Sequence, residues 1–251
     1  MSSLLMVAEG PPPRKRQRIE AAQTNVPSST PSAQPTETGT IASPLSAVGQ
    51  LPTTDNLHPQ AFLKSLFSSN VYGKELVTRK HRSTFQKPSQ EEIDAYDMQA
   101  VGAVRSGDIA RLRVMARESG KSFNACNRFG ESLIHMACRR GDVKVVRFLI
   151  REASVRTDIR DDYGRTPAHD ACWTSKPNFD VMEELLQVLP LEMFLSEDVR
   201  GFTPFQYARR EHWPEWVQFL NERRSLLFNR LKVSESAAQA VKSSSPVQIT
   251  G

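Results

Sequence analysis

The apolar positions of this chain come in short blocks with helical spacing, separated by turn signals. Residues 145–149 (Val-Val-Arg-Phe-Leu) and 216–220 (Trp-Val-Gln-Phe-Leu) share one pattern of paired apolar positions. This spacing predicts two helices that each carry one apolar face. No such helix can bury that face within its own short block, so we expect neighbouring blocks to stack on each other.

The blocks belong to an internal repeat of 34 residues. Residues 127–142 align with residues 161–173 at an offset of 34, and residues 198–209 follow 37 residues later because of an insertion within 173–179. A degenerate copy at residues 103–108 lies 34 residues before residues 137–142. A fixed period of this length is the signature of a repeat architecture. Four units of this length fill residues 91–227.

Each unit contains its own start and stop signals. An Asx-x-x-Gly sequence predicts a turn, because the Asx side chain bonds back to the backbone and Gly adopts positive φ. Thr-Pro then opens a short helix as N-cap and first helical residue. Gly107 and Gly141 end that helix as left-handed C-caps. A second helix follows, and in the last unit Pro214 stands near its start, where proline is tolerated.

This pattern resembles the ankyrin repeat, a turn followed by Thr-Pro-Leu-His-x-Ala and two antiparallel helices. The resemblance implies an all-α ankyrin-repeat solenoid over residues 91–227. Ser132-Leu133 replaces Thr-Pro in one unit, Gln206 replaces the His in the last, and the first unit has lost the motif. We expect the first and last units to be end caps with polar outer residues, namely Arg105, Arg111, Glu222, Arg223 and Arg224.

The flanking segments differ from the repeats in composition. Residues 1–61 hold nine of the 16 prolines and no aromatic residue, so residues 1–58 are predicted to be a disordered Pro/Ser/Thr-rich arm. Residues 59–90 are predicted to be a short amphipathic helix, with its apolar face at Phe62, Leu63, Leu66 and Phe67, followed by a basic linker. This helix either docks on the end of the stack or binds a groove of a partner, and docking is favoured. Residues 228–251 are predicted to be a polar tail.

The charge distribution argues against a repeat domain that binds nucleic acid. The chain has a net charge of +5, yet residues 91–227 hold 20 basic and 22 acidic residues. Residues 61–90 hold six basic residues and one acidic residue. The alternative to a protein-binding function is therefore a nucleic-acid-associated regulatory factor that uses this basic segment. Within it, Arg79-Lys80-His81-Arg82 is best explained as a solvated linker, although a second import signal or a phosphate contact would also fit.

A basic cluster in the arm predicts the location of the protein. Arg14, Lys15, Arg16 and Arg18 follow three prolines and form a sequence of the kind that import receptors recognise. The longest clean apolar run, residues 4–8, is too short to cross a membrane and lacks preceding positive charge. We therefore expect an intracellular protein, nuclear or nucleo-cytoplasmic, with an import receptor as one partner and no membrane contact.

The sequence offers little catalytic chemistry. His135 and Cys138 recur as His169 and Cys172. The period itself explains this recurrence better than a zinc site, which needs four converging ligands. The resemblance gives these histidines a hydrogen-bonding role between repeats. The three cysteines are expected to be reduced, and the acidic pairs 161–162 and 183–184 to be solvated surface. No nucleotide, metalloprotease or hydrolase motif is present, which predicts a protein without enzymatic activity, metal or cofactor.

The resemblance implies a protein-protein interaction module, an adaptor or regulator, that binds partners through turn tips and the concave face of the short helices. The variable repeat positions mix arginines with aromatics, as interface hot spots do. The predicted partner-binding residues are Arg128, Phe129, Glu131, Met136, Arg139 and Arg140 in one unit, Asp162, Tyr163, Arg165, Asp170 and Trp173 in the next, and Val199, Arg200, Phe202, Tyr207 and Arg210 in the last.

Overall fold

The computed structural model describes residues 57–79, 81, 87–118 and 122–243. These residues form helices and turns, and Cys126 and Ser132 pair in an isolated antiparallel β-bridge. The predicted all-α fold is confirmed. Nearly all of the predicted arm and residues 244–251 of the predicted tail lie outside the described residues.

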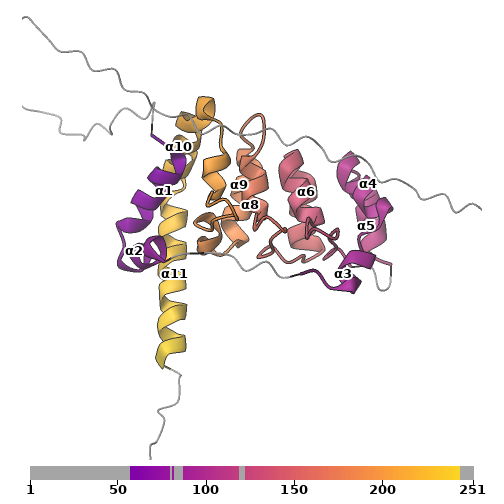
Figure 1. The fold of residues 1–251 in the computed structure, drawn as a ribbon, viewed down its shortest axis with the longest axis horizontal. Coiled ribbons are helices and arrows are strands. Elements are labelled where there is room, and N and C mark those ends of the chain that lie inside the picture. The colour runs from indigo at the N-terminus through magenta and orange to yellow at the C-terminus, as the bar shows by residue number, and fades with distance from the viewer. Residues whose placement is uncertain (1–56, 80, 82–86, 119–121, 244–251) are drawn as a thin grey trace, which may run out of the picture. The chain divides into compact units, whose positions relative to one another are not determined.

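Paired helices follow the predicted period. The described part of the chain holds four pairs: α4 (Met98–Ser106) with α5 (Ile109–Ala116), α6 (Leu133–Arg140) with α7 (Val143–Arg147) and its π-helical continuation η2 (Phe148–Glu152), α8 (Pro167–Cys172) with α9 (Phe179–Val188), and the 3-10 helix η4 (Pro204–Tyr207) with α10 (Trp213–Glu222). Two further 3-10 helices, η3 (Leu191–Phe194) and η5 (Arg210–His212), lie in the connections. Figure 1 shows the pairs side by side in chain order.

The first helices of the units end where the glycines predict. Gly107 caps α4 with φ 69° and Gly141 caps α6 with φ 71°, a left-handed conformation that glycine adopts without steric cost. In the third unit the insertion replaces this glycine. There α8 ends at Cys172, and Asn178 caps α9 while its amide donates to the Gly141 carbonyl at 2.7 Å. The inserted loop thus remains anchored to the preceding unit.

The second helices carry the core. The paired apolar positions of both blocks are buried as predicted: Val145, Val146, Phe148, Leu149, Trp216, Val217, Phe219 and Leu220. Phe179 of α9 contacts the Trp216 ring at 5.0 Å and stacks on the Phe219 ring at 5.1 Å. These contacts join the third unit to the last one, so the apolar faces are buried between units rather than within them.

The predicted amphipathic helix docks on the last unit. It forms α1 (Pro59–Ser68), and its four apolar side chains are buried. Buried Gln60 secures the contact, because its amide donates to the Phe194 carbonyl at 3.1 Å and its oxygen accepts from the Phe205 N–H at 3.3 Å. Of the two alternatives, the structure shows that the helix docks on the end of the stack. Its apolar face is therefore buried and not free for a partner.

The C-terminal end of the stack differs from the prediction. Residues 224–243 form one helix, α11, which contacts α1, α10 and α2 (Val71–Thr78). Leu227 and Leu231 are fully buried, so the predicted boundary at residue 227 and the polar tail from residue 228 must be corrected. Glu222, Arg223 and Arg224 do not form the outer cap, because helices from both ends of the chain cover the last unit. At the opposite end, Arg105 and Arg111 are exposed on α4 and α5 as expected.

The connection to the first unit contains a short helix, α3 (Gln90–Asp94), with a capping box between Ser89 and Glu92. The Glu92 carbonyl accepts from the Cys126 N–H at 3.1 Å, and the Glu92 carboxylate pairs with Arg156. These contacts tie α3 to the second unit. Part of the predicted basic linker, residue 80 and residues 82–86, lies outside the described residues.

Candidate functional site

Three equivalent turns form one edge of the repeat stack, each organised by one Asx side chain. Asp161 Oδ1 accepts from the N–H groups of Tyr163 at 3.0 Å and Arg165 at 2.8 Å. Asn127 and Asp198 make the same two bonds in their own turns. The predicted Asx turns are therefore confirmed, and each places the side chain after its glycine in a defined direction.

The turns are also joined to one another. The Asp162 N–H donates to the Phe129 carbonyl at 2.8 Å, and the Val199 N–H donates to the Tyr163 carbonyl at 2.9 Å. Each bond links the tip of one turn to the tip of the next. The turn tips therefore hold fixed positions relative to each other, as a rigid binding surface requires.

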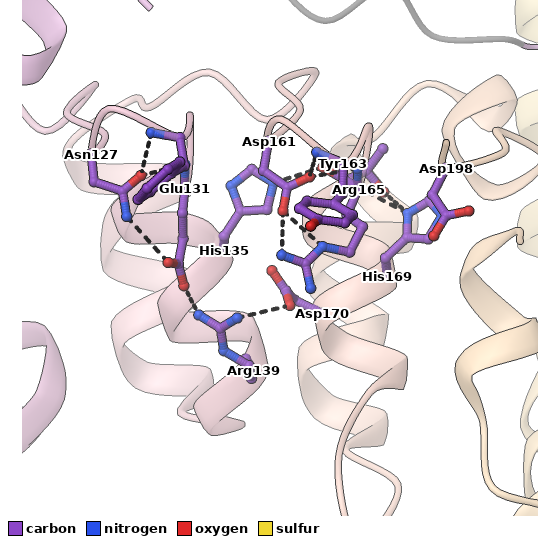
Figure 2. A network of polar contacts seen from close by, with 12 residues as sticks. Asn127, Glu131, His135, Arg139, Asp161, Tyr163, Arg165, His169, Asp170 and Asp198 are labelled. Atoms are coloured by element: carbon purple, nitrogen blue, oxygen red, sulfur yellow. Dashed lines mark hydrogen bonds and ion pairs between the residues drawn. The ribbon is translucent and has the colours of Figure 1, made fainter. Parts of the chain in front are cut away.

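The two repeated histidines lie beneath these turns and connect adjacent units. His169 Nδ1 accepts from the Thr166 N–H at 3.0 Å, and its Nε2–H donates to the Phe202 carbonyl of the next turn at 3.0 Å. His135 makes the equivalent bonds with Ser132 and with the Arg165 carbonyl at 3.0 Å. Figure 2 shows both imidazoles in this row. Their predicted hydrogen-bonding role is confirmed.

Burial keeps His169 neutral, because it lowers the pKa of the imidazole to about 4. Protonation would also remove the Nδ1 acceptor that caps α8. Cys138 and Cys172 are buried free thiols, and burial raises the pKa of each well above its ordinary value. No group of three metal-ligating side chains occurs among the described residues. The H-x-x-C pairs thus serve packing and inter-repeat bonding.

Arg139 joins the second and third units through two carboxylates. Its guanidinium pairs with Glu131 above it and with Asp170 Oδ1 on α8 at 3.4 Å, as Figure 2 shows. Asp170 is buried, and burial raises the pKa of its carboxyl despite the nearby arginines. Its Oδ2 atom has no hydrogen-bond partner within the described part of the chain. This carboxylate therefore holds Arg139 through its Oδ1 atom rather than facing solvent.

Arg165 is held on three sides. Its Nε donates to Asp161 Oδ2 at 2.7 Å, and the guanidinium lies over the rings of Tyr163 at 5.5 Å and Trp173 at 5.3 Å. Only 14% of the side chain is exposed. The contact is a cation-π arrangement in which the arginine fixes two aromatic rings. Trp173 itself remains 40% exposed, so its outer side is available to a partner.

The last turn repeats this arrangement with other residues. Arg200 donates to the Tyr207 hydroxyl at 2.5 Å and to Asp198 Oδ2 at 3.3 Å, while its guanidinium lies over the Phe202 ring at 5.3 Å. Tyr207 donates to Asp198 Oδ2 at 2.5 Å and contacts the Trp173 ring at 5.9 Å. Burial and the Asp198 bond raise the pKa of Tyr207 above its ordinary value. The residues around Arg200 are thus in direct contact with those around Arg165.

We call these connected residues the Arg/aromatic face: Arg128, Phe129, Glu131, Arg139, Arg140, Asp162, Tyr163, Arg165, Trp173, Val199, Arg200 and Phe202. All were predicted as contact residues, and all are at least partly exposed. Arg210, also predicted, is exposed and lies over the Trp213 ring at 5.9 Å.

Three predicted contact residues need correction. Met136, Asp170 and Tyr207 occupy the same repeat position, and each is less than 9% exposed. The next unit covers this position at Met136 and Asp170, whereas Tyr207 in the last unit packs against His169 and Trp173 of the preceding unit. These side chains therefore do not reach a partner. Asp170 and Tyr207 instead position the exposed Arg139 and Arg200 by direct hydrogen bonds.

The solvated interpretation of the acidic pairs is wrong for one member of each pair. Asp161 is 1% exposed and Glu184 is 4% exposed. Glu184 on α9 accepts from Arg147 at 2.9 Å and from Arg151 at 3.0 Å. Burial raises the pKa of Glu184, but the arginine bonds outweigh it and leave that pKa below its ordinary value. A sequence signal for this pair was available. Glu184 follows Arg147 by 37 residues, the same offset that separates the turns at Asp161 and Asp198.

The predicted basic sites contribute little to this face. Arg79 pairs with Glu75 at 2.7 Å on α2, and His81 Nε2 lies 2.6 Å from the Leu76 carbonyl. The import cluster at Arg14, Lys15, Arg16 and Arg18 lies outside the described residues. None of the helices in the described ranges is long and apolar enough to span a bilayer.

Comparison with known proteins agrees with this geometry. Residues 98–192 match the family model described as ankyrin repeats, in three copies. The match begins with α4 and ends within η3, so the last pair, η4 and α10, lies beyond it. A search of curated protein sequences found no match to the chain. The family match and the repeated helix pairs together confirm the predicted repeat.

Proposed function

We propose that this chain, which carries ankyrin repeats over residues 98–192, acts as a non-catalytic protein-protein interaction module, an adaptor or regulator. Ankyrin repeats generally mediate protein-protein interaction, and the family is typically non-catalytic. One observation supports this function above others. The Arg/aromatic face presents exposed Trp173 and Phe129 on a framework of internally paired arginines.

The framework is suited to binding because it is organised before a partner arrives. Arg165 is held by Asp161, Tyr163 and Trp173, and Arg200 is held by Asp198 and Tyr207. Ordering a flexible side chain on binding costs about 0.5–1.5 kcal/mol. Side chains already held by the stack avoid most of that cost, and tryptophan, tyrosine and arginine are the residues most often found at interface hot spots.

The exposed members of the face would make the contacts. Trp173 and Phe129 offer apolar area, and Arg128 lies over the Phe129 ring at 4.7 Å. The partner would lie along the turn tips and the first helices of the units, on the side that forms the concave surface of ankyrin stacks. Fold alone does not identify that partner.

Partner recovery from the native cell tests this function. The full chain with Trp173→Ala and Arg128→Glu is compared with a control carrying Val114→Ala on α5 and Arg117→Glu at its C-cap, two exposed positions that are not part of the Arg/aromatic face. We expect the proteins recovered with the parent to be lost from the face variant and kept by the control. Circular dichroism melting confirms that both variants are folded. Recovery of the same proteins with all three chains would contradict the proposed face.

We also propose nuclear import through Arg14, Lys15, Arg16 and Arg18. The support is the basic composition of this cluster directly after three prolines. Replacing Arg14, Lys15 and Arg16 by Ala in a fusion too large to diffuse through nuclear pores should move the protein from nucleus to cytoplasm. Partner binding by the repeats should persist, because arm and stack are recognised separately. An unchanged distribution would contradict the import signal.

A further inference from the structure

The arginines of the Arg/aromatic face, together with Arg105 of the first unit, fall into two groups. Arg139, Arg165 and Arg200 are each paired with carboxylates of their own or the next unit. Arg105, Arg128 and Arg140 are exposed, and within the described ranges no ion pair joins them to a carboxylate. The carboxylates Glu131, Asp161, Asp170 and Asp198 are bound by the first group. These four carboxylates are therefore engaged by the first group, and none of them forms an ion pair with the second group.

The second helices of the units show the contrast. There Arg113 pairs with Glu152 at 2.8 Å, and Arg147 and Arg151 both pair with Glu184 at 2.8 and 2.6 Å. These pairs run from one unit to the next, and two carboxylates neutralise most of the charge of three arginines along that side. Among the described residues, no such pair reaches Arg105, Arg128 or Arg140.

The positions of these residues follow the repeat. Arg105, Arg139 and Trp173 occur at successive offsets of 34 residues, at or just after the ends of α4, α6 and α8. Arg140 directly follows Arg139. A chain that crosses the first helices therefore meets an arginine in the first unit, two in the second and an exposed tryptophan in the third.

From this charge pattern we infer that the preferred partner is an acidic, extended segment of another protein, which crosses the first helices of the units. This inference rests on the proposed function and adds the chemistry of the partner. A chain extended as a polyproline II helix has three residues per turn and advances about 3.1 Å per residue, and packed helices lie about 8–10 Å apart. Residues spaced by three therefore face successive units. Acidic residues at positions i and i+3 would face Arg105 and Arg140, and an aromatic residue at i+6 would face Trp173.

A polypeptide fits this surface better than a nucleic acid. The exposed arginines of the second group stand on different helices and turns, and they do not form the continuous basic strip that a row of phosphates would need. The repeat domain as a whole carries 20 basic and 22 acidic residues over residues 91–227. Separate carboxylates at the arginine positions satisfy both features.

The test uses the full chain and fluorescently labelled peptides of about twelve residues. The first peptide carries Glu at i and i+3 and Phe at i+6, the second has the same composition in shuffled order, and the third carries Lys in place of Glu. A single-stranded oligonucleotide is the fourth probe. Anisotropy is measured at low and at moderate salt. We expect the first peptide to bind most tightly and to weaken with salt.

Variants locate the contact. Arg105→Glu combined with Arg140→Glu should weaken binding of the first peptide at least about tenfold, while the matched control Arg117→Glu should change it less than about twofold. Equal binding of the Lys or shuffled peptide, absence of binding at millimolar concentration, or tighter binding of the oligonucleotide would each overturn the acidic-partner inference.

A selection from a random peptide library separates this inference from the proposed function. Enriched peptides that require Trp173 and carry acidic residues at the stated spacing support both. Enriched peptides that require Trp173 but are not acidic would leave the interaction module intact and overturn the partner chemistry. A library that yields no Trp173-dependent peptide would contradict the proposed function itself.

Discussion

An interior unit and the last unit of this stack use the same repeat positions differently. In the third unit His169 caps α8 and also donates to the Phe202 carbonyl of the following turn. In the last unit Gln206 accepts from the Thr203 N–H at 2.8 Å and caps only its own helix, η4. No further turn follows this unit, so the second bond of the histidine has no acceptor there.

The interior units and the last unit also differ in what packs against their C-terminal side. Interior units are covered by the next repeat, with small residues such as Ala171 and Cys172 at the contact. The last unit is covered by α1 and α11, which add large side chains such as Phe67 and Leu231, and α2 packs against these two helices. A residue at a given repeat position is therefore explained by what packs against it, and the last unit differs because its neighbour is not a repeat.

The largest expected loss of stability comes from a substitution in α1, the helix that covers the last unit. Phe67→Ala should destabilise the protein by about 3–5 kcal/mol, because the side chain is fully buried and leaves a cavity. Val114→Ala, at an exposed position of the first unit, should change stability by less than about 0.5 kcal/mol. Urea unfolding followed by circular dichroism measures both. Equal losses would mean that α1 does not seal the stack.

The second effect is a pH dependence that originates in the interior unit. The folded pKa of His169 is about 4, below the 6.5 of the unfolded chain. The unfolded state therefore binds the proton first, and stability from the neutral imidazole is lost as pH falls from 6.5 to 4. Between pH 7.5 and 5 the loss should be about 2 kcal/mol. Asp170 opposes it, because its raised pKa favours the folded state on acidification.

The His169→Gln variant isolates this contribution, since it keeps the α8 cap without the titration. The difference in unfolding free energy between parent and variant, measured at both pH values, should shrink by the stated amount on acidification. A difference that stays constant would show that His169 does not titrate in this range.

At neutral pH, His169→Gln in the interior unit is compared with the reverse substitution, Gln206→His, in the last unit. His169→Gln should cost about 1–3 kcal/mol, because the buried Phe202 carbonyl loses its donor. Gln206→His should stay within about 0.5 kcal/mol of the parent, because the side chain is exposed and no further turn offers a carbonyl. Thermal melts at pH 7.5 suffice. A comparable loss in both variants would argue that capping, not the bond between units, is what matters.

The smallest effect concerns two glycines with positive φ. Gly141→Val should destabilise by roughly 1 kcal/mol or more, because a β-branched residue is strained at φ 71°. A side chain there would also displace Asn178, whose amide nitrogen lies 2.0 Å from the new Cβ position. Gly201→Val should cost less, since no atom lies within 4 Å of its Cβ position. The order of the two melting temperatures checks this, and the reverse order would contradict it.

Features carried by a few consecutive residues were predictable. The turn at Asp161, the cap at Thr166 and the termination at Gly141 depend on side-chain-to-backbone bonds within four residues, and each was identified from its motif. The repeat offset extended these predictions to three turns at once. Most of the Arg/aromatic face followed from the same offset, because its residues stand at variable positions between the fixed ones.

Features that join distant parts of the chain were not predictable. Gln60 bonds to Phe194 and Phe205, more than 130 residues away, and nothing near Gln60 in the sequence indicates those acceptors. Met136, Asp170 and Tyr207 were expected on the surface because their repeat position varies, yet packing against a neighbouring unit buries them. The burial of Glu184 by Arg147 and Arg151 has the same origin.

The sequence by itself determined the helix pairs, their caps, their turns and the order of the units, because these depend on local hydrogen bonds and on a period that repeats them. Only the tertiary structure decided what covers the last unit, which carboxylates are buried and which arginines form no ion pair within the described residues. Those outcomes depend on apolar area and charge brought together from distant segments, as when α1 and α11 close the end of the stack.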